Sequence, residues 1–587
     1  MTALQKRWQV LPPAPPEQLA AFPDLAPLIV QLLYNRQIRT VDEVQSFLSR
    51  STAVDNPFLL TGMNEAVTRL RQAIRSGEAI AIYGDYDVDG VAATALLVPT
   101  LRALGAQVIP YIPNRMEEGY GLNEGAVKAL AQQGIKLVVT VDCGVRSTKE
   151  AALARRMGLD LIITDHHALG EELPAAVAVI DPRREDDRYP FKQLAGVGLA
   201  FKLAQALLRA EKRVPASRPM RGASAQGQDL PQEEDLLDLV ALGTVADLAP
   251  LIGENRVLVC RGLERLRQAQ RPGVAAMLAE AELRPEGVGA GAVGFVLGPR
   301  LNAAGRLDNA MASYELLTTS SAEEAAQLAQ KLGAQNRERQ QLMQQMVDQA
   351  REEVLALGDE PVYVLASPAY TVGIAGLVAS RVTEEFYRPT IVIALEGEES
   401  KGSARSISAF HITQALDACK GLLVKYGGHA AAAGLTIKNE NIGALREALS
   451  AIAQEQLSDE DWVPALKIDW PLALTQATGE TLTMLEGLQP FGVGNPTPTF
   501  ISQDVQVREA RPVGTERPGL KLKLSDGKAV WDAIAFGEIA SERPAARVDV
   551  VYTLQSRTWN GQARLELVVK DFRPASVLHP AFLAGEG

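Results

Sequence analysis

The sequence predicts an α/β protein with a parallel-sheet domain, a long connecting helix, a second smaller α/β domain and a C-terminal OB-like β-barrel. Three observations support this fold class. Five short apolar runs separated by helix-like stretches recur from residue 79, one long helical pattern follows residue 319, and short alternating strands follow about residue 465. Strands that alternate with helices indicate βαβ units and a helix-covered parallel sheet. A chain of 587 residues also exceeds what one hydrophobic core usually supports.

Each domain follows from its local pattern. The expected strands of the parallel sheet are AIAIYG, QVIPYIP, KLVVTVD, DLIITD and AVAVID. The connecting helix opens with serine caps and closes on a glycine, and short strands such as LKLKL and ARLELVVKD are typical of a small barrel. The expected boundaries are 1–50 for an N-terminal segment, 51–319 for the parallel-sheet domain, 320–358 for the helix, 359–460 for the second α/β domain and 461–587 for the barrel and tail.

The composition is typical of a globular protein of the cytoplasm. No stretch approaches 18 consecutive apolar residues, and the N-terminus lacks the apolar core of a signal peptide, so we expect no membrane partner. The three cysteines are widely separated and form no CxxC pair, which argues against a disulfide framework and a thiolate zinc site. Residues 212–234 are rich in Pro, Gly, Ser and Gln and are interpreted as a flexible surface insertion.

The charge distribution limits where a nucleic acid could bind. A net charge of −12 excludes a uniformly basic coat, so any binding surface must be local. Between residues 467 and 573, 13 basic residues balance 13 acidic ones, which favours this segment as the strand-binding surface. Basic and aromatic residues alternate along its expected strands, which is typical of a platform that stacks the bases of a single strand: Lys521, Lys523, Trp531, Arg557, Trp559 and Arg564. Trp531 is equally well explained as a core residue.

Acidic residues and histidines follow the expected strands of the parallel sheet. The run AIAIYG leads into Asp85, Asp87 and Asp89, KLVVTV leads into Asp142, and DLIIT leads into Asp165-His166-His167. The carboxyl ends of parallel strands meet at one edge, which is where such sheets bind ligands. A further aspartate, Asp247, lies in GTVADLAP. This density of anionic oxygen is costly unless cations neutralise it.

The donor types indicate the metal and the reaction. Carboxylates mixed with imidazole and no thiolate suit Mn²⁺ or Mg²⁺ better than Zn²⁺, and the number of ligands indicates two ions. Two-ion sites hydrolyse phosphate esters, and Asp142 is a natural bridging ligand in such a site. A lone aspartate after a strand more often caps a turn or helix. Asp85 therefore stays open between a ligand, a residue that supports the ligands, and a cap.

The motifs DYDVDG, VDCG, DHH and GTVADLAPL resemble the four ordered motifs of the DHH phosphoesterase superfamily. The resemblance implies metal ligands at Asp87, Asp89, Asp142, His166 and Asp247, with His167 beside the ions. We predict catalytic roles for His167 and for Asp85, whose exact role stays open. The segments IPNRMEEGYGLN, AGVGLAFKL, GPRLNAAGRLD, KGSARSI, YGGHAAAAGLTI and LQPFGVGNPTPTF further resemble the RecJ family of single-strand-specific 5′-to-3′ exonucleases, in the same order, from about residue 80 to 500. His411 departs from that pattern, since an acidic residue is expected there, and the 212–234 insertion departs as well.

Several residues in these segments are candidates for binding the substrate. Arg306 and Arg405 lie in Gly/Ala/Ser-rich surroundings that let a backbone approach a phosphate while the guanidinium binds it. We expect Ser403 and Arg405 to form a loop that holds the 5′-terminal phosphate. Gly427, Gly428 and His429 offer backbone N–H groups and an imidazole for the scissile phosphate, with His429 as a catalytic donor.

Two more candidates lie in NRMEEGYG. Arg115 could contact backbone phosphate, and Tyr120 could stack on a base, since stacking accepts any base and suits an enzyme without sequence preference. A tyrosine buried in the core is an equally good interpretation of Tyr120. Both residues are therefore predicted substrate contacts, and Tyr120 also has a purely structural alternative.

The complete prediction is a cytoplasmic nuclease of DNA repair and recombination. It would pass single-stranded DNA along the barrel into a cleft between the two α/β domains and release nucleotides from the 5′ end. The family resemblance implies a helicase and a single-strand-binding protein as partners and a monomeric state. One alternative is a DHH-superfamily phosphodiesterase that acts on short RNA or small phosphorylated substrates, and another is an inactive replication scaffold.

Overall fold

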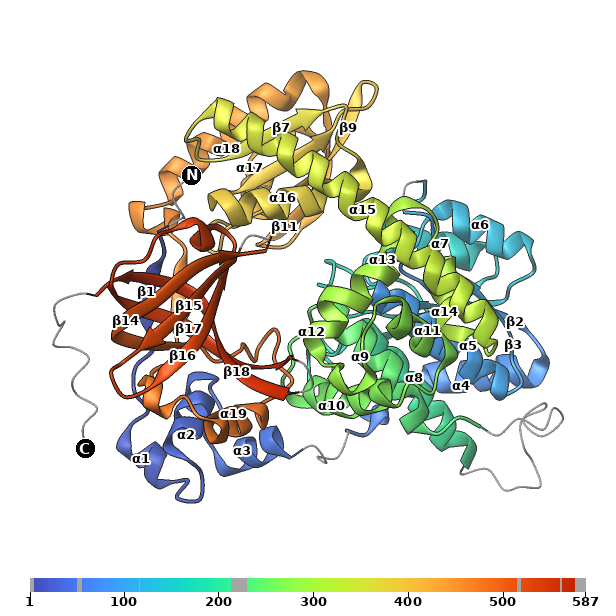
Figure 1. Cartoon of the computed structure of the whole chain (residues 1–587). Coiled ribbons are helices and arrows are strands. Elements are labelled where there is room, and N and C mark those ends of the chain that lie inside the picture. Colours follow the sequence, from blue (N-terminus) through green and yellow to red (C-terminus); the bar gives the residue numbers. More distant parts are fainter. Residues whose placement is uncertain are drawn as a thin grey trace. The chain divides into compact units, whose positions relative to one another are not determined.

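The computed structural model divides the chain into two compact units (Figure 1). The parallel-sheet unit contains residues 49–345 and 490–495, and the barrel unit contains residues 1–48, 346–489 and 496–587. The structure describes residues 5–49, 55–115, 117–212, 230–514, 519–559 and 562–575. The core of the predicted surface insertion, residues 213–229, lies outside the described residues.

A five-stranded parallel sheet forms the centre of the parallel-sheet unit, with the order β3-β2-β4-β5-β6. Its strands are the five apolar runs of the sequence: β2 (Ala79–Gly84), β3 (Gln107–Tyr111), β4 (Leu137–Val141), β5 (Asp160–Thr164) and β6 (Ala178–Ile180). The chain order reverses between β2 and β4. In sheets of this kind, the crevice outside the carboxyl ends at the reversal point is the usual ligand site.

Helices cover both faces of this sheet because side chains alternate along each strand. Ile80 and Ile82 of β2 face one core, which includes side chains of α4 (Met63–Ser76), α5 (Val88–Ala103) and α8 (Gly196–Lys212). Ala81 and Tyr83 face the other core, formed with α6 (Glu124–Gln132) and α7 (Thr148–Arg156). The sheet is therefore buried on both sides, as its continuous apolar strands require.

The remainder of the parallel-sheet unit is helical. Its elements are α9 (Leu237–Ala246), α10 (Gly253–Gln268), α11 (Pro272–Glu280), α12 (Ala290–Ala292), a π-helical turn (Val293–Leu297), α13 (Gly298–Leu307) and α14 (Met311–Thr318). The helix α15 (Ala322–Leu357) then leads into the barrel unit. It is the single long connecting helix that the sequence predicts.

A second α/β sheet lies in the barrel unit and has the order β10-β11-β9-β8-β7. Only β7 and β8 are parallel neighbours, and the other pairs are antiparallel. The elements are β7 (Tyr363–Ser367), α16 (Val372–Phe386), β8 (Thr390–Ala394), β9 (Glu399–Arg405), α17 (Ile412–Ala418), β10 (Leu423–Gly428), β11 (Ala432–Lys438) and α18 (Ile442–Gln456). His411, the residue that departs from the family pattern, caps α17 by accepting a hydrogen bond from Gln414 N at 3.3 Å.

The C-terminal strands close into a barrel, which confirms the OB-like fold. The order β14-β15-β16-β18-β17 returns to β14, since β14 also pairs with β17. All neighbours are antiparallel except β16 and β18. The strands are β14 (Phe500–Val513), β15 (Gly519–Ser525), β16 (Val530–Phe536), β17 (Arg547–Trp559) and β18 (Gln562–Pro574).

The N-terminal segment folds with the C-terminal half of the chain. Its strand β1 (Arg7–Val10) pairs in parallel with β12 (Ala465–Ile468), and Arg36 of α2 (Pro27–Asn35) forms a buried ion pair with Asp469 at 3.4 Å. The sequence predicts no partner for this segment, because pairing across more than 400 residues leaves no local pattern. Among the described residues, no helix is long and apolar enough to cross a membrane.

A buried ionic cluster fastens the start of the parallel-sheet unit to two of its helices. Lys202 of α8 contacts the carboxylate of Glu254 in α10 and donates to the carbonyl oxygen of Asp55 at 2.8 Å. Tyr189 donates from its hydroxyl to Glu254 at 2.5 Å. Lys202 is fully buried, so each member of the cluster depends on the others for compensation.

Replacing Lys202 with methionine should destabilise the parallel-sheet unit by about 3–5 kcal/mol, because Glu254 would keep its charge without its cation. Hydrogen exchange of peptides from α8 and α10 would measure this loss. The matched control is Arg381→Met, which removes an ion pair with Glu384 whose side chains are 60% and 66% exposed. We expect that change to cost less than about 1 kcal/mol. Equal effects of the two substitutions would contradict the assignment.

Candidate metal centre

Acidic and imidazole side chains gather at the carboxyl edge of the parallel sheet. Asp85 follows β2, Asp142 follows β4, and Asp165, His166 and His167 follow β5. The three aspartates and His166 are buried, and His167 is partly exposed. The two strands that carry Asp85 and Asp142 flank the point where the strand order reverses. The site therefore lies where this topology places ligands.

The three aspartates of DYDVD have different local roles. Asp87 is the N-cap of α5, where its carboxylate accepts hydrogen bonds from Asp89 N at 2.9 Å and Gly90 N at 3.3 Å. Asp85 does not cap this helix, although the sequence left that role open. Its Oδ1 is buried and has no hydrogen-bond partner in the described part of the chain. A buried carboxylate oxygen without a partner is costly, which favours a cation beside it.

Asp89 and the N-terminus of α8 form a second part of the site. The carboxylate of Asp89 accepts one hydrogen bond from Gly196 N and another from Val197 N, both at 2.7 Å. The amides at a helix N-terminus are ready donors to an anion. These two amides therefore fix the orientation of the Asp89 carboxylate. Each of its oxygens keeps a lone pair that could bind a cation, because a carboxylate offers about four acceptor sites.

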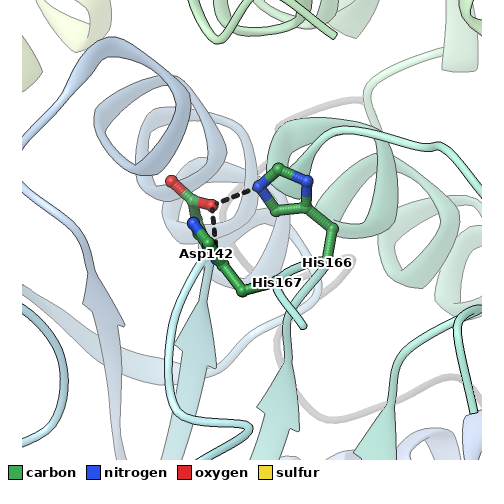
Figure 2. Close-up of side chains that lie close together, drawn as sticks. All are labelled: Asp142, His166 and His167. Carbon is green, nitrogen blue, oxygen red and sulfur yellow. Dashed lines mark ion pairs between the residues drawn. The ribbon is translucent and has the colours of Figure 1, made fainter. Parts of the chain in front are cut away.

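His166 lies at the centre of the carboxylates. Its Nε2 is 2.9 Å from Asp142 Oδ1, 3.7 Å from Asp89 Oδ2 and 3.9 Å from Asp247 Oδ2. Asp247 reaches this point as the residue that follows α9. Figure 2 shows the imidazole of His166 directed at the carboxylate of Asp142. One nitrogen atom thus faces carboxylates from three separate segments of the chain.

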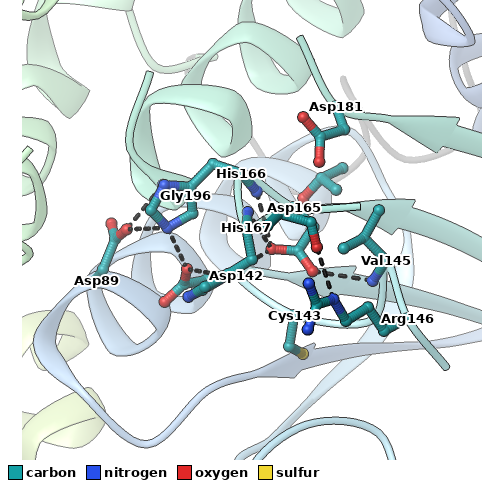
Figure 3. Close-up of polar contacts among 12 residues, drawn as sticks. Asp89, Asp142, Cys143, Val145, Arg146, Asp165, His166, His167, Asp181 and Gly196 are labelled. Carbon is teal, nitrogen blue, oxygen red and sulfur yellow. Dashed lines mark hydrogen bonds and ion pairs between the residues drawn. The ribbon is translucent and has the colours of Figure 1, made fainter. Parts of the chain in front are cut away.

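His167 is held by Asp165 (Figure 3). Asp165 Oδ1 lies 2.8 Å from His167 Nδ1 and also accepts from the backbone N–H groups of His166 and His167. Its Oδ2 accepts from Val145 N at 2.9 Å. A carboxylate fixed at both oxygens sets the ring orientation of a neighbouring histidine. The hydroxyl of Tyr120 lies 3.1 Å from His167 Nδ1 on the solvent side.

Glycines permit the close packing of this site. A Cβ on Gly196 would lie 2.6 Å from Asp142 Cβ, and one on Gly243 would lie 2.8 Å from Asp89 Oδ1. Asp142 itself has a left-handed backbone with φ of 63°, which is uncommon for a residue other than glycine. The backbone at Asp142 is therefore strained, and the two glycines leave the space that its side chain and that of Asp89 occupy.

Burial and mutual repulsion raise the pKa values of the carboxyl groups. Burial first and the charge of Asp87 second raise the pKa of Asp89 to about 7. Burial and the charge of Asp89 raise the pKa of Asp247 to about 9, and the same two causes raise that of Asp142 well above its ordinary value. The carboxylates cannot all be ionised together at neutral pH unless other positive charge enters the site.

The donor atoms fit divalent cations. Three groups of side chains each bring their ligand atoms within 4.8 Å of one another. Asp142 and His166 each belong to two of these groups, and the carboxylate of Asp142, with its two oxygen atoms, could serve two neighbouring cations. Oxygen ligands with one or two imidazoles suit Mn²⁺ and Mg²⁺. The groups are Asp85, Asp87 and Asp142; Asp142, His166 and His167; and Asp89, His166 and Asp247.

Three predicted substrate residues lie beside this centre. The guanidinium carbon of Arg115 lies 4.9 Å from the ring centroid of Tyr86. Tyr86 belongs to the acidic segment DYDVD. Tyr120 is 53% exposed, so its side chain is not part of the core. Arg306 is in the last turn of α13, where the preceding Gly305 allows the helix to approach the carbonyl of Tyr86 closely.

The other predicted substrate residues belong to the barrel unit, and two expectations about them were wrong. Ser403 and Arg405 lie on strand β9 and not in a loop, because β9 pairs with both β8 and β11. Their side chains meet over Gly376 of α16, where an added Cβ would lie 3.1 Å from Arg405 Nη2 and 3.5 Å from Ser403 Oγ. The backbone N–H of His429 is not open, since it donates to Ala432 O at 2.8 Å.

The surroundings of Gly428 and His429 explain the turn that they form. A Cβ on Gly428 would lie 2.3 Å from the carbonyl oxygen of Ala432, so only glycine fits this position. The side chain of His429 is exposed, and its carbonyl oxygen accepts from Thr413 Oγ1 at 2.8 Å. The imidazole of His429 therefore sits on a turn whose backbone is fixed.

Sequence reasoning missed residues that act through distant contacts. It counted Asp165 among the acids but gave it no role in holding His167. Gly196 and Asn302 lie in segments that resemble the RecJ family, but the sequence indicated no role for either residue, although Asn302 Oδ1 accepts from Val88 N at 3.1 Å. It also passed over Asp181, which follows β6 and whose pKa burial raises to about 7. The only available signal for Asp181 was its position after the strand AVAVI.

Comparisons with known proteins place three domains along the chain. Residues 79–244 match the DHH family N-terminal domain, residues 359–455 match the DHHA1 domain and residues 468–571 match the RecJ OB domain. The single-stranded-DNA-specific exonuclease RecJ of Bacillus subtilis is 38% identical over 583 residues, which cover 97% of this chain and 71% of that protein. The protein of the same name from Escherichia coli is 35% identical over 570 residues, 94% of this chain and 96% of that protein.

A solved structure is similar over the same extent. The crystal structure of RecJ in complex with Mn²⁺ from Thermus thermophilus superimposes with a TM-score of 0.81 at 30% sequence identity. The match covers 97% of this chain and 80% of that one. The same protein has been solved in complex with Mg²⁺, with a TM-score of 0.76.

Substituting Gly196 with alanine should weaken Mn²⁺ binding by about 10- to 100-fold, because the new methyl group would displace Asp142 and the amide that holds Asp89. Gly198→Ala on the same helix is the matched control, since its nearest neighbour would lie at an ordinary 3.4 Å. Calorimetric titration with Mn²⁺ would measure both variants. Unchanged affinity in Gly196→Ala would contradict the proposed ligand geometry.

Mg²⁺ affinity should rise with pH, by about tenfold or more between pH 6 and 8. The raised pKa values of Asp89, about 7, and Asp247, about 9, mean that the folded, metal-free site holds protons that an unfolded chain would release. The metal-free protein should therefore lose stability as pH rises through these values. Titrations in buffers of different ionisation enthalpy would reveal the released protons. A Mg²⁺ affinity that does not change with pH would refute this account.

Proposed function

The chain belongs to the RecJ family, and on that premise we propose that it is a metal-dependent exonuclease that hydrolyses single-stranded DNA from the 5′ end. The observation that carries this proposal is the set of carboxylates and imidazoles at the reversal point of the parallel sheet. All predicted ligand side chains converge there. A scaffold without activity has no physical use for such a concentration of buried charge, and a small-substrate enzyme has no use for the barrel.

The residues of this chain divide the work of hydrolysis. We assign Asp87, Asp89, Asp142, His166 and Asp247 to holding two cations. When bound, Mn²⁺ or Mg²⁺ would supply Lewis acidity and lower the pKa of a water molecule. Asp165 favours one tautomer of His167 through Nδ1, and we assign Nε2, which lies 3.4 Å from the Tyr120 hydroxyl, to contact the reacting phosphate. The carboxylate of Asp85 balances positive charge of the cations. His429 donates a hydrogen bond to the scissile phosphate.

The polarity of digestion rests on Ser403 and Arg405. Their side chains converge over Gly376, where the absence of a Cβ lets the guanidinium and the hydroxyl approach the helix closely. Arginine binds phosphate oxygens in a bidentate manner, and a serine hydroxyl adds a further donor. A terminal 5′-phosphate carries more charge than a phosphodiester. We therefore assign this pair to the 5′ end of the strand, with Arg115, Tyr120 and Arg306 along its path.

The barrel supplies a surface for the rest of the strand. In OB-folds the second and third strands form the usual oligonucleotide surface, and here these are β15 and β16. Lys521 and Lys523 lie on β15. Trp531 on β16 donates from its indole nitrogen to Leu474 O at 2.9 Å, so it is anchored within its own unit. The basic residues of β15 are the better candidates for contacting the backbone.

The wider setting follows from the family alone. We propose a cytoplasmic enzyme of DNA repair and recombination that acts as a monomer. A helicase and a single-strand-binding protein would supply its substrate, because an exonuclease that threads single strands requires an unwound end. Co-purification and sizing of the purified chain would test these assignments separately from the chemistry.

Digestion of single-stranded DNA labelled at either end tests the activity. With Mn²⁺ we expect early release of the 5′ label as mononucleotide, little attack on duplex DNA or RNA, and no reaction in EDTA. Asp142→Asn should lower the rate by about a hundredfold or more, because it removes charge from the ligand that neighbouring cations would share. Early release of the 3′ label would refute the polarity, and cleavage of dinucleotides alone would favour a small-substrate enzyme.

The same assay isolates the role of Arg405. Arg405→Ala should abolish the preference for a 5′-phosphate over a 5′-hydroxyl end while leaving cation binding unchanged. Arg381→Ala, which changes an exposed arginine of α16, is the matched control. An unaltered end preference in Arg405→Ala would show that the terminal phosphate binds elsewhere.

A further inference from the structure

Phe295 is the most exposed large apolar side chain in the described part of the chain, at 86%, and Leu248 follows at 68%. Aromatic side chains carry much of the apolar surface that folding normally buries. No predicted role accounts for either residue. Both belong to the parallel-sheet unit, and both lie on elements that carry or contact the metal centre.

Phe295 lies in a π-helical turn that packs on the last turn of α9. A Cβ on Gly294 would lie 3.8 Å from Val245 Cγ1, and one on Gly298 would lie 3.4 Å from Ala246 Cβ. The next residues of that segment are Asp247, a proposed metal ligand, and Leu248. Leu248 has a left-handed backbone with φ of 60°. The two exposed apolar residues thus come from segments that touch directly beside a ligand.

The sequence explains why the helix widens at Phe295. Pro299 has no N–H, and its ring would clash with the carbonyl of Phe295 in a regular α-helix. The chain instead forms a bond from Gly298 N–H to Val293 O, five residues back. Such π-helical turns are rare and occur frequently at functional sites. A non-glycine residue in the left-handed region, such as Leu248, is likewise a form of strain that clusters at such sites.

The distance from Phe295 to the acidic loop, residues 85–89 (DYDVD), corresponds to a few nucleotides. Helix α13 docks on that loop through Asn302, whose Oδ1 accepts from Val88 N at 3.1 Å. Phe295 precedes Asn302 by seven residues, which is roughly 10 Å along a helix. Stacked bases are about 3.4 Å apart along a strand. A base that meets Phe295 would therefore be about two to four nucleotides from the phosphate at the cations.

We propose that Phe295 and Leu248 form a base-stacking subsite, on which a base of the single-stranded substrate near the scissile phosphate rests. The inference depends on the proposed nuclease function. An aromatic face accepts every base, so the subsite would bind without sequence preference. A protein partner fits less well, because anything large that covered these residues would also cover the adjacent ligand Asp247.

Fluorescence of 2-aminopurine reports stacking directly. We expect quenching when this base occupies one of positions two to five from the 5′ end of an oligonucleotide bound without cleavage in Ca²⁺. Phe295→Ala should abolish the quenching at that position, and Phe295→Trp should restore it. Leu248→Asn, which tolerates the same backbone, should reduce it. Leu355→Ala removes another exposed apolar side chain, 57% exposed on α15, and should change nothing.

Kinetics separate this inference from the proposed function. Phe295→Ala should raise KM for oligonucleotides about tenfold, while kcat and hydrolysis of the p-nitrophenyl ester of thymidine 5′-monophosphate stay unchanged. If the wild-type protein hydrolysed neither substrate, the nuclease proposal itself would fail. If the wild type were active and Phe295→Ala kept its KM or its quenching, the stacking subsite would be refuted. A higher KM with intact quenching would also refute it, because Phe295 would then act only on the fold.

Discussion

Buried like charges at one edge of the parallel sheet are the constraint on which the parallel-sheet unit depends. Asp85, Asp89 and Asp142 are all buried, and burial together with the charge of neighbouring carboxylates raises the pKa of each. Backbone amides supply part of the compensation: the start of α5 binds Asp87, and the start of α8 binds Asp89. Helix N-termini carry only partial positive charge. The remaining negative charge is neutralised by protons in the metal-free site, and cations that bind there would replace those protons.

The topology brings these groups together at little conformational cost. Parallel strands in the order β3-β2-β4-β5-β6 place every strand end at one edge, so residues separated by up to about 80 positions become neighbours. The all-helical part then approaches closely only where side chains are absent. Gly196, Gly243 and Gly305 each stand at such a contact with Asp142, Asp89 or the carbonyl of Tyr86. A methyl group at any of them would force the ligand loops apart.

Local patterns were sufficient to predict the strands, the long helix, the barrel and the positions of the acids, because each depends on neighbours in sequence. Contacts between distant segments left no such pattern. The pairing of β1 with β12, the hold of Asp165 on His167 and the docking of Asn302 on Val88 all became visible only in three dimensions. The error at Ser403 and Arg405 has the same origin. Small residues around Arg405 indicated a loop, whereas pairing of β9 on both sides makes it a central strand.

The division of residues between the two units has a consequence for how the proposed enzyme would work. The cation ligands belong to the parallel-sheet unit, and Ser403, Arg405 and His429 belong to the barrel unit. The chain passes between the units after Leu48, within α15 and on either side of residues 490–495. That short segment is bound to the sequence after Asp247, where Leu251 N donates to Val493 O at 2.7 Å and Asn495 is fully buried. Cation binding can therefore be complete within one unit, whereas the proposed recognition of a 5′ end would require the other. Substitutions at Arg405 and at Asp142 should accordingly separate end preference from hydrolysis, since the two properties depend on side chains with no ligand in common.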